Sequence, residues 1–321
     1  MPRIVYLAFP NGKLTGGQKM ILRHVETLRD LGFDAVVRRN VDNVDSGAFD
    51  HRAPIQVGGP FEPDDILVLP SDAPSAIGAV ARGPWKSLVF VQNQFDYAAI
   101  GAAAVAQFPG GVPSAFISVS PSVTAALARL HPGAPVEFIP AFADERIFKP
   151  APAGRHDAIA VSPRKRRLEL KSIQGFLAAS HPRHTAVPWR VLENMRETDV
   201  AAAFRFSTVC LSLSRLEALG LTPLEAMASG CIVAGFTGVG GRDFATAGNG
   251  FWVAEDECDL AADALAQALD LVATGGPLLK AMRDAGHATA EQWSYARFRT
   301  ALEDTWMRHA PQARISSGPL T

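Results

Sequence analysis

Two glutamates, Glu217 and Glu225, stand eight positions apart in the stretch "SRLEALGLTPLEAMASG" (214–230). One continuous helix through both is disfavoured by Pro223, because a proline inside a helix removes a backbone hydrogen bond and clashes with the preceding turn. Thr222 and Pro223 instead match the residue types that begin a helix, threonine as the N-cap and proline at the first helical position. We therefore expect Glu217 in a loop and Glu225 in the first helical turn, so that the two carboxylates reach different parts of one ligand.

Both glutamates also have a purely structural interpretation. The run from Thr222 to Glu225 matches the capping box S/T-x-x-E, in which the glutamate accepts a hydrogen bond from the N-cap amide, and Glu217 fits an exposed loop carboxylate. Beside them, Gly220 permits a tight turn, and the amides of residues 221–225 lie where a helix start binds an anion. An anion site flanked by carboxylates suits a ligand with phosphates and sugar diols, since amides donate to phosphate and carboxylates accept from hydroxyls.

A basic cluster follows a predicted strand in the second half of the chain. The stretch "SPRKRRLELK" (162–171) holds five cations, which are Arg164, Lys165, Arg166, Arg167 and Lys171. One interpretation is a solvated basic turn. The other is a clamp on a diphosphate, in which guanidinium and ammonium groups offset the charge of a leaving group. Arg164 and Lys165, nearest the end of the strand, are the preferred contacts, followed by Lys171.

Glycines and amides follow two predicted strands in the first half. "NGKLTGGQ" (11–18) contains neither GxxxxGK[ST] nor GxGxxG, so it predicts neither a P-loop nor a nicotinamide dinucleotide site. Its Gly16 and Gly17 either let a substrate approach the backbone or fit a tight turn. Asn93, in "VQNQFDY" (91–97), either hydrogen-bonds a sugar or caps the next helix. The later glycine loop "GFTGVGGRDF" (235–244) also lacks GxGxxG.

The elements that position these residues form two α/β series. The stretch "RIVYLAF" (3–9), the helical run that ends at Gly32 and the strand "FDAVVRR" make a βαβ opening, which implies a parallel sheet. Prolines and a glycine in 145–157 predict a linker, after which a second α/β series begins. The predicted fold is α/β, with two Rossmann-like doubly wound domains facing across a central cleft, and ligands bind such sheets beyond the carboxyl ends of the strands.

The predicted boundaries follow from the linker and the last helical pattern. We expect an N-terminal, acceptor-side domain at 1–147, a C-terminal donor-binding domain at 148–293, a closing helix at 294–310 that returns to the first domain, and a tail at 311–321.

Composition narrows the functional classes. With 31 basic and 32 acidic residues the chain offers no overall field for nucleic acid. Three cysteines without CxxC spacing argue against disulfides or zinc and favour a reducing, cytoplasmic location. The histidines show no HxxxH or HExxH pair, so no metal is expected. No run of about 18 apolar residues predicts a transmembrane segment, although peripheral contact with a membrane stays open.

The stretch "SRLEALGLTPLEAMASGCIVAGFTGVGGRDF" resembles the E-x7-E region of the retaining glycosyltransferases of family 4, which have the GT-B fold. "TGGQKMILRHVETLRDLGFDAVV" is similar to the opening loop and helix of that family, and "QWSYARFRTALEDTW" is similar to its closing helix. The chain departs from the family in having "SPRKRRLELKS" where G-R-L…K-G is usual, and Gln92-Asn93-Gln94 where many members have a histidine.

The resemblance implies a role for each matching residue. Glu225 corresponds to the glutamate that holds the ribose hydroxyls of a nucleotide, and Glu217 to the one that faces the transferred sugar. The amides from Gly220 to Thr222 correspond to those against the donor phosphates. The basic diphosphate pair is matched by Arg164 and Lys165, or by Lys171, and the acceptor or sugar side by Gly16, Gly17 and Asn93.

The function implied is a glycosyltransferase, metal-independent and without a cofactor, that moves a hexosyl group from a UDP- or GDP-type sugar to an acceptor hydroxyl with retention of configuration. The acceptor would be a saccharide, a lipid-linked sugar or a small molecule, in polysaccharide or glycoconjugate biosynthesis. Three alternatives remain, which are an inverting transferase, a nucleotide-sugar epimerase and a non-catalytic nucleotide-sugar-binding subunit.

Overall fold

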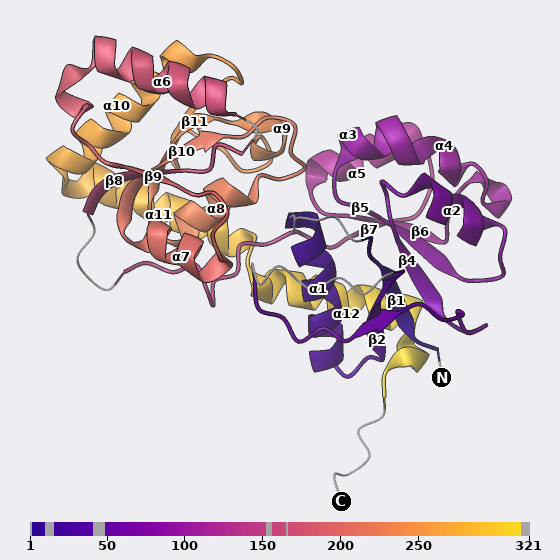
Figure 1. The fold of residues 1–321 in the computed structure, drawn as a ribbon. Coiled ribbons are helices and arrows are strands. Elements are labelled where there is room, and N and C mark those ends of the chain that lie inside the picture. The colour runs from indigo at the N-terminus through magenta and orange to yellow at the C-terminus, as the bar shows by residue number, and fades with distance from the viewer. Residues whose placement is uncertain (1, 10–15, 41–48, 152–155, 165, 316–321) are drawn as a thin grey trace, which may run out of the picture. The chain divides into compact units, whose positions relative to one another are not determined.

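The computed structural model describes residues 2–9, 16–40, 49–151, 156–164 and 166–315. The chain forms two compact units (Figure 1). The first unit is Met1–Pro140 together with Phe298–Thr321, and the second unit is Ala141–Arg297.

The first unit is built on a seven-stranded parallel sheet of order β3-β2-β1-β4-β5-β6-β7. Its middle strands are buried along their whole length because they are apolar on both faces, as parallel strands covered by helices on each side must be. The strands are β1 (Ile4–Leu7), β2 (Ala35–Arg39), β3 (Ile55–Val57), β4 (Ile66–Pro70), β5 (Ser87–Val91), β6 (Ala115–Ser118) and β7 (Val136–Phe138).

Short helices connect these strands. They are α1 (Gly16–Asp30), α2 (Pro74–Ala81), α3 (Gln94–Asp96), a π-helical turn (Tyr97–Gly101), α4 (Ala102–Val105) and α5 (Pro121–Leu130). The predicted parallel βαβ opening is therefore present, with β1 paired to β2 and to β4.

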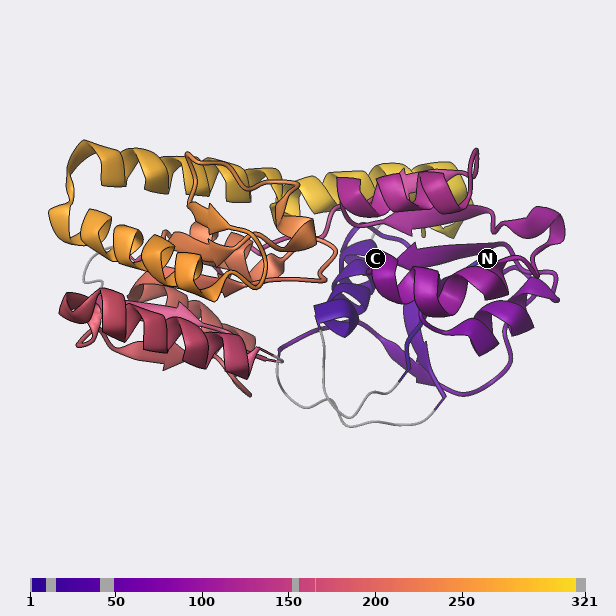
Figure 2. The ribbon, with the colours of Figure 1, turned by 90° about the horizontal axis from the view of Figure 1, so that it is seen from above.

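The second unit is built on a five-stranded parallel sheet of order β12-β11-β10-β8-β9. Its strands are β8 (His156–Val161), β9 (Trp189–Val191), β10 (Ser207–Leu213), β11 (Ile232–Phe236) and β12 (Phe251–Val253). Its helices are α6 (Arg167–Ser180), α7 (Glu197–Arg205), α8 (Leu221–Ala228), α9 (Gly238–Gly241), α10 (Cys258–Thr274) and α11 (Gly276–Gln292). Figure 2 shows α6 and α10 side by side on one face, where Ile173 and Leu265 are fully buried in the core.

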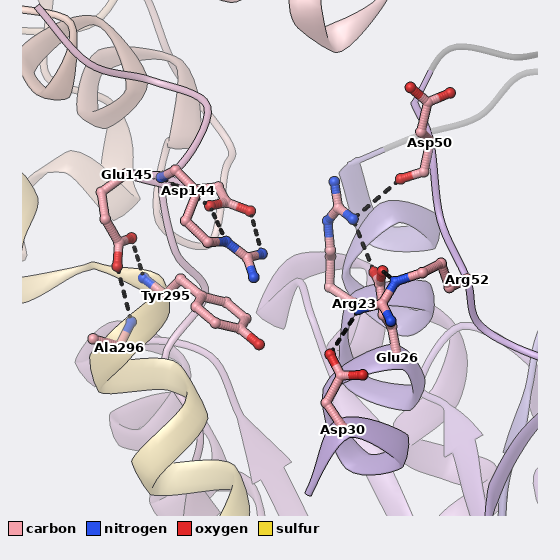
Figure 3. A network of polar contacts seen from close by, with 10 residues as sticks. Arg23, Glu26, Asp30, Asp50, Arg52, Asp144, Glu145, Tyr295 and Ala296 are labelled. Atoms are coloured by element: carbon pink, nitrogen blue, oxygen red, sulfur yellow. Dashed lines mark hydrogen bonds and ion pairs between the residues drawn. The ribbon is translucent and has the colours of Figure 1, made fainter.

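The last long helix, α12 (Tyr295–His309), begins in the second unit and continues in the first from Phe298. Within the second unit, the Glu145 carboxylate accepts hydrogen bonds from the amides of Tyr295 (2.6 Å) and Ala296 (3.2 Å), so a side chain distant in sequence satisfies the helix start (Figure 3). The first residues of the predicted tail have a defined structure. Pro311–Ala313 form a short 3-10 turn, and the Ile315 amide donates to the Gly32 carbonyl.

An aromatic cluster fills the core of the first unit beneath β1. The Tyr6 hydroxyl lies 3.0 Å from Nδ1 of His24, and the His24 ring centroid lies 4.6 Å from that of Phe90 and 4.9 Å from that of Phe298. His24 is fully buried, and burial lowers the pKa of its imidazole to about 3. The folded state thus holds His24 neutral over a range in which an unfolded chain, with a histidine pKa of about 6.5, would protonate it.

This difference predicts a loss of stability in acid. The folded pKa lies below the unfolded one, so the contribution of His24 is complete above about pH 6.5 and is lost as the pH falls toward about 3, at roughly one proton per unfolding event. Urea unfolding followed across this range should show a smaller pH slope in the double variant Tyr6→Phe/His24→Phe, which removes both hydrogen-bonding partners together. The matched control His287→Gln, on an exposed helix face, should leave the slope unchanged; an unchanged slope in the double variant would contradict the assignment.

Candidate functional site

Charged side chains gather in the loops that follow β8, β10 and β12 in the second unit. All strands of this sheet are parallel, so these loops emerge at one edge, beyond the carboxyl ends of the strands. The edge is where a doubly wound sheet binds its ligands. It receives residues from 162–166, 214–220 and 254–257.

Glu217 lies in the loop after β10 and is partly buried. Burial raises the pKa of its carboxyl, a shift that Arg164 opposes, Glu225 reinforces and Arg166 opposes further. Glu217 therefore interacts electrostatically with Glu225 and with both arginines. The structure brings together four of the charged side chains that the sequence singled out, which are Glu217, Glu225, Arg164 and Arg166.

Glu225 lies within α8 and is only 8% exposed. The helix begins at Leu221, with Gly220 as its N-cap at a φ of 86°. The predictions of Thr222 as N-cap, of Pro223 as the first helical residue, of a capping box and of Glu225 in the first turn are therefore wrong. The physical reason is that Gly220 adopts the left-handed conformation without the steric cost of a Cβ, which starts the helix earlier. Thr222 and Pro223 thus lie inside the first turn, where a proline is tolerated because no N–H is needed there.

The start of α8 keeps the features of an anion site. Gly220 has no side chain to cap the helix, and the amides of Leu221 and Thr222 have no acceptor within it. The positive end of the helix dipole adds to this preference for negative charge. Pro223 contributes no donor, so the predicted set of amides is reduced to those that precede it.

The loop that carries Glu217 is held by the glycines that follow β11. The Val239 amide donates to the Arg215 carbonyl at 2.8 Å. A Cβ on Gly240 would lie 2.4 Å from the Leu219 nitrogen, so only glycine allows this approach. The glycine loop 235–244 therefore shapes the neighbouring loop, a role that its sequence pattern did not indicate.

The described cations of the basic cluster lie in different environments. Arg164 lies in the loop after β8 in a left-handed conformation, with a φ of 38°, and is exposed. Arg166 donates through Nη1 to Glu169 at 2.7 Å, and Arg167 donates through Nη2 to Glu193 at 2.8 Å. Lys171 is exposed on α6, which begins at Arg167 and so takes in half of the predicted turn. Lys165 lies outside the described residues.

Backbone strain marks the same edge. Among the described residues other than glycine, those with a positive φ are Arg164, Asn194 and Asp256, in the loops after β8, β9 and β12. Each such conformation costs about 1–3 kcal/mol and persists only where its surroundings impose it. Arg215 joins the loops after β10 and β12 through an ion pair with Asp256 at 3.1 Å. The sequence contained no sign of these features.

The predicted residues of the first unit lie at the corresponding edge of its own sheet. Gly16 and Gly17 open α1, and the loop 10–15 before them is outside the described residues. The Asn93 side chain accepts hydrogen bonds from the amides of Phe95 (2.9 Å) and Asp96 (3.2 Å), so of its two predicted roles the structure shows the cap. Gln94 beside it is 7% exposed, and its Oε1 has no hydrogen-bond partner among the described residues.

The described residues contain no group of three or more His, Cys, Asp or Glu side chains that would hold a metal ion. Cys210 and Cys231 are buried thiols, and burial raises the pKa of Cys210. Within the described helices, none combines the length and apolar character needed to cross a bilayer.

Part of the second unit matches a known protein family, and most of the chain is similar to a curated enzyme. Residues 187–288, which include Glu217 and Glu225, match the model of the family glycosyl transferases group 1. Over 287 residues the chain is 27% identical to an alpha-1,6-glucosyltransferase of Actinobacillus pleuropneumoniae serotype 7 (strain AP76), covering 83% of each protein.

Solved structures show the same architecture. Sucrose-phosphate synthase from Thermosynechococcus elongatus is 13% identical, with a TM-score of 0.71 over 97% of this chain and 100% of that one. Anabaena Alr3699/HepE, solved in complex with UDP-glucose, is 14% identical, with a TM-score of 0.70 over 95% of this chain and 99% of that one. The chain has the GT-B fold, as predicted, and its second unit carries a segment that matches glycosyl transferases group 1.

Proposed function

We propose that the protein transfers a sugar from a nucleotide-diphosphate donor to an acceptor hydroxyl with retention of anomeric configuration. The observation that carries the proposal is the pair Glu217 and Glu225 at one edge of the second sheet, with arginines and a helix start beside them. Carboxylates suit sugar hydroxyls, and amides and guanidinium groups suit phosphates, so this edge offers both halves of a nucleotide sugar its complement. The family match over 187–288, which includes both glutamates and the start of α8, supports this assignment.

UDP-glucose is the donor that we favour among UDP- and GDP-type sugars. The name of the curated relative specifies a glucosyl group, and HepE was solved with UDP-glucose. The same name specifies an α-1,6 product. Because glucose is α-linked in UDP-glucose, an α product requires retention. A 1,6 linkage would make the acceptor nucleophile the primary hydroxyl of a hexose.

The geometry suggests how the leaving group is stabilised. As the bond from the anomeric carbon to the phosphate oxygen breaks, its electron pair goes to the diphosphate, whose charge Arg164, Arg166 and the Leu221 and Thr222 amides would offset. The acceptor oxygen forms the new bond on the same face of the sugar. Its proton passes to the departing phosphate oxygen, so no protein base is needed.

Glu217 and Glu225 would hold different parts of the donor. Glu225, buried in α8, would accept hydrogen bonds from the ribose hydroxyls. Glu217, in the loop after β10, would accept a hydrogen bond from the transferred sugar. The two roles are separable by substitution.

A donor screen tests the proposal directly. Thermal-shift measurements with UDP-, GDP-, dTDP- and ADP-sugars should show stabilisation by at least one, with UDP-glucose first; stabilisation by none would overturn it. NMR assignment of the anomeric centre in the product separates retention from inversion, and conversion of the donor sugar without acceptor would indicate an epimerase. Donor binding without transfer or hydrolysis across a broad acceptor panel would indicate a binding subunit.

Glu217→Gln should lower turnover on the order of 100-fold, because one carboxylate contact to the reacting sugar loses its charge. The same variant should melt higher than the wild type at neutral pH. The folded pKa of Glu217 is raised, so its protonated form supports the fold in acid and this support is lost as the pH rises through the folded pKa. Glutamine lacks this loss, so the difference in melting temperature should grow from pH 4 to pH 8, and a difference that shrinks over this range would contradict the electrostatic assignment.

Glu225→Gln should weaken donor binding about tenfold, since an amide oxygen is a poorer acceptor for a diol than a carboxylate. The fold should be retained, because glutamine matches the shape of the buried side chain. Calorimetric titration with UDP measures the effect, with Glu291→Gln on the exposed face of α11 as the control. Unchanged affinity in a folded Glu225→Gln protein would assign this residue a structural role alone.

A further inference from the structure

Arg166 is paired with one carboxylate and acts electrostatically on a second, which comes from a different element. Its Nη1 donates to Glu169, in the first turn of α6, at 2.7 Å. Its charge also opposes the rise that burial causes in the pKa of Glu217, in the loop after β10. The guanidinium therefore lies at the start of α6, within electrostatic range of the glutamate that we place on the transferred sugar.

The Arg166–Glu169 pair is well shielded from water. The two side chains are 22% and 18% exposed, whereas the neighbouring Arg167–Glu193 pair has an arginine that is 72% exposed. Burial alone would raise the pKa of Glu169, but the hydrogen bonds from Arg166 and from its own backbone amide, with the charges of Arg166 and Arg215, hold it below its usual value. The thiol of Cys258 is the other titratable group coupled to this carboxylate. Glu169 is therefore held in its charged form beside Arg166.

Among the described residues, the bond to Glu169 engages one N–H group of the guanidinium, so the others are available for a second anion. An arginine side chain has many rotamers, and a ligand must otherwise overcome this conformational entropy to immobilise it. A carboxylate that fixes one end of the fork before the ligand arrives removes part of this cost.

We propose that Glu169 is a positioning residue that orients Arg166 toward the diphosphate of the donor, an inference that rests on the proposed function. Glu169 does not touch the donor in this scheme; it acts through Arg166. Its negative charge would itself repel a diphosphate, so any loss of affinity on its removal must come from the lost orientation of Arg166.

A simpler role must be separated from this one. Glu169 is an acidic residue in the first turn of α6, where it stabilises the helix dipole without reference to Arg166. The helix role predicts a loss of stability that is independent of residue 166. The positioning role predicts a loss of donor affinity that exists only when Arg166 is present.

A double-mutant cycle distinguishes the two roles. UDP-glucose affinity is measured calorimetrically in the wild type, Glu169→Ala, Arg166→Ala and the double variant, with thermal unfolding of each. Glu169→Ala should weaken binding about five- to tenfold, whereas in the Arg166→Ala background the same change should leave affinity unaltered or improve it. Glu169→Gln, which can still accept from Arg166, should bind within about twofold of the wild type. Glu193→Ala removes the exposed pair and should change nothing.

Two further outcomes keep the test decisive. If Glu169→Ala fails to fold, Glu169→Asp retains the helix-start charge but shortens the reach to Arg166, and it should show the weakened binding with a normal melting temperature. Equal weakening in both backgrounds, or no weakening in a folded Glu169→Ala and Glu169→Asp, would overturn the positioning role while donor binding by the wild type leaves the proposed function standing. Absence of donor binding by the wild type would overturn both.

Discussion

The close approach of two loops in the second unit is the constraint on which the candidate site depends. The backbone after β11 runs so near the loop after β10 that a Cβ on Gly240 would meet the Leu219 nitrogen at 2.4 Å, and one on Gly238 would meet Ser214 at 2.7 Å. This contact sets the path of the chain from Arg215 to Gly220, and with it the place of Glu217. The left-handed turn at Gly220 then starts α8 early enough to bury Glu225 within the helix. Three glycines thereby determine where two carboxylates lie.

Such an arrangement gathers like charges, and the arginines make it tolerable. Glu217 and Glu225 repel each other, and burial of Glu217 adds to the cost, so its pKa rises. Arg164 and Arg166 reduce that cost without removing it. Burial of the charged Glu217 carboxylate lowers the stability of the fold. The same carboxylate is suited to hold a sugar hydroxyl in a water-poor environment, so stability and function make opposite demands on it.

Much of the fold was predictable because its patterns are local. Apolar strands, helical periodicity and glycine or proline boundaries predicted two parallel α/β sheets, and the spacing of Glu217 and Glu225 predicted one carboxylate in a loop and one in a helix. The helix start was predicted wrongly, since Thr222 and Pro223 match a common N-terminal pattern and the outcome depended on the φ angle of Gly220. The sequence predicted that the second domain would begin at 148, and the second unit begins at Ala141.

What the sequence did not predict depends on where one helix begins and on contacts between distant elements. Arg166 pairs with Glu169 rather than projecting into solvent because α6 begins at Arg167, which places residue 169 one turn away on the same side. The strained residues Arg164 and Asp256 lie in loops after the non-adjacent strands β8 and β12, and the Arg215–Asp256 pair joins the loop after β10 to the loop after β12. Periodicity cannot encode the Arg215–Asp256 pair, since that contact is decided by strand order. Because the order β12-β11-β10-β8-β9 puts β10 at the centre, its loop lies beside the loops that follow β11 and β8. The pKa of Glu217, in that loop, is therefore set by its burial together with charges from the loop after β8 and from α8.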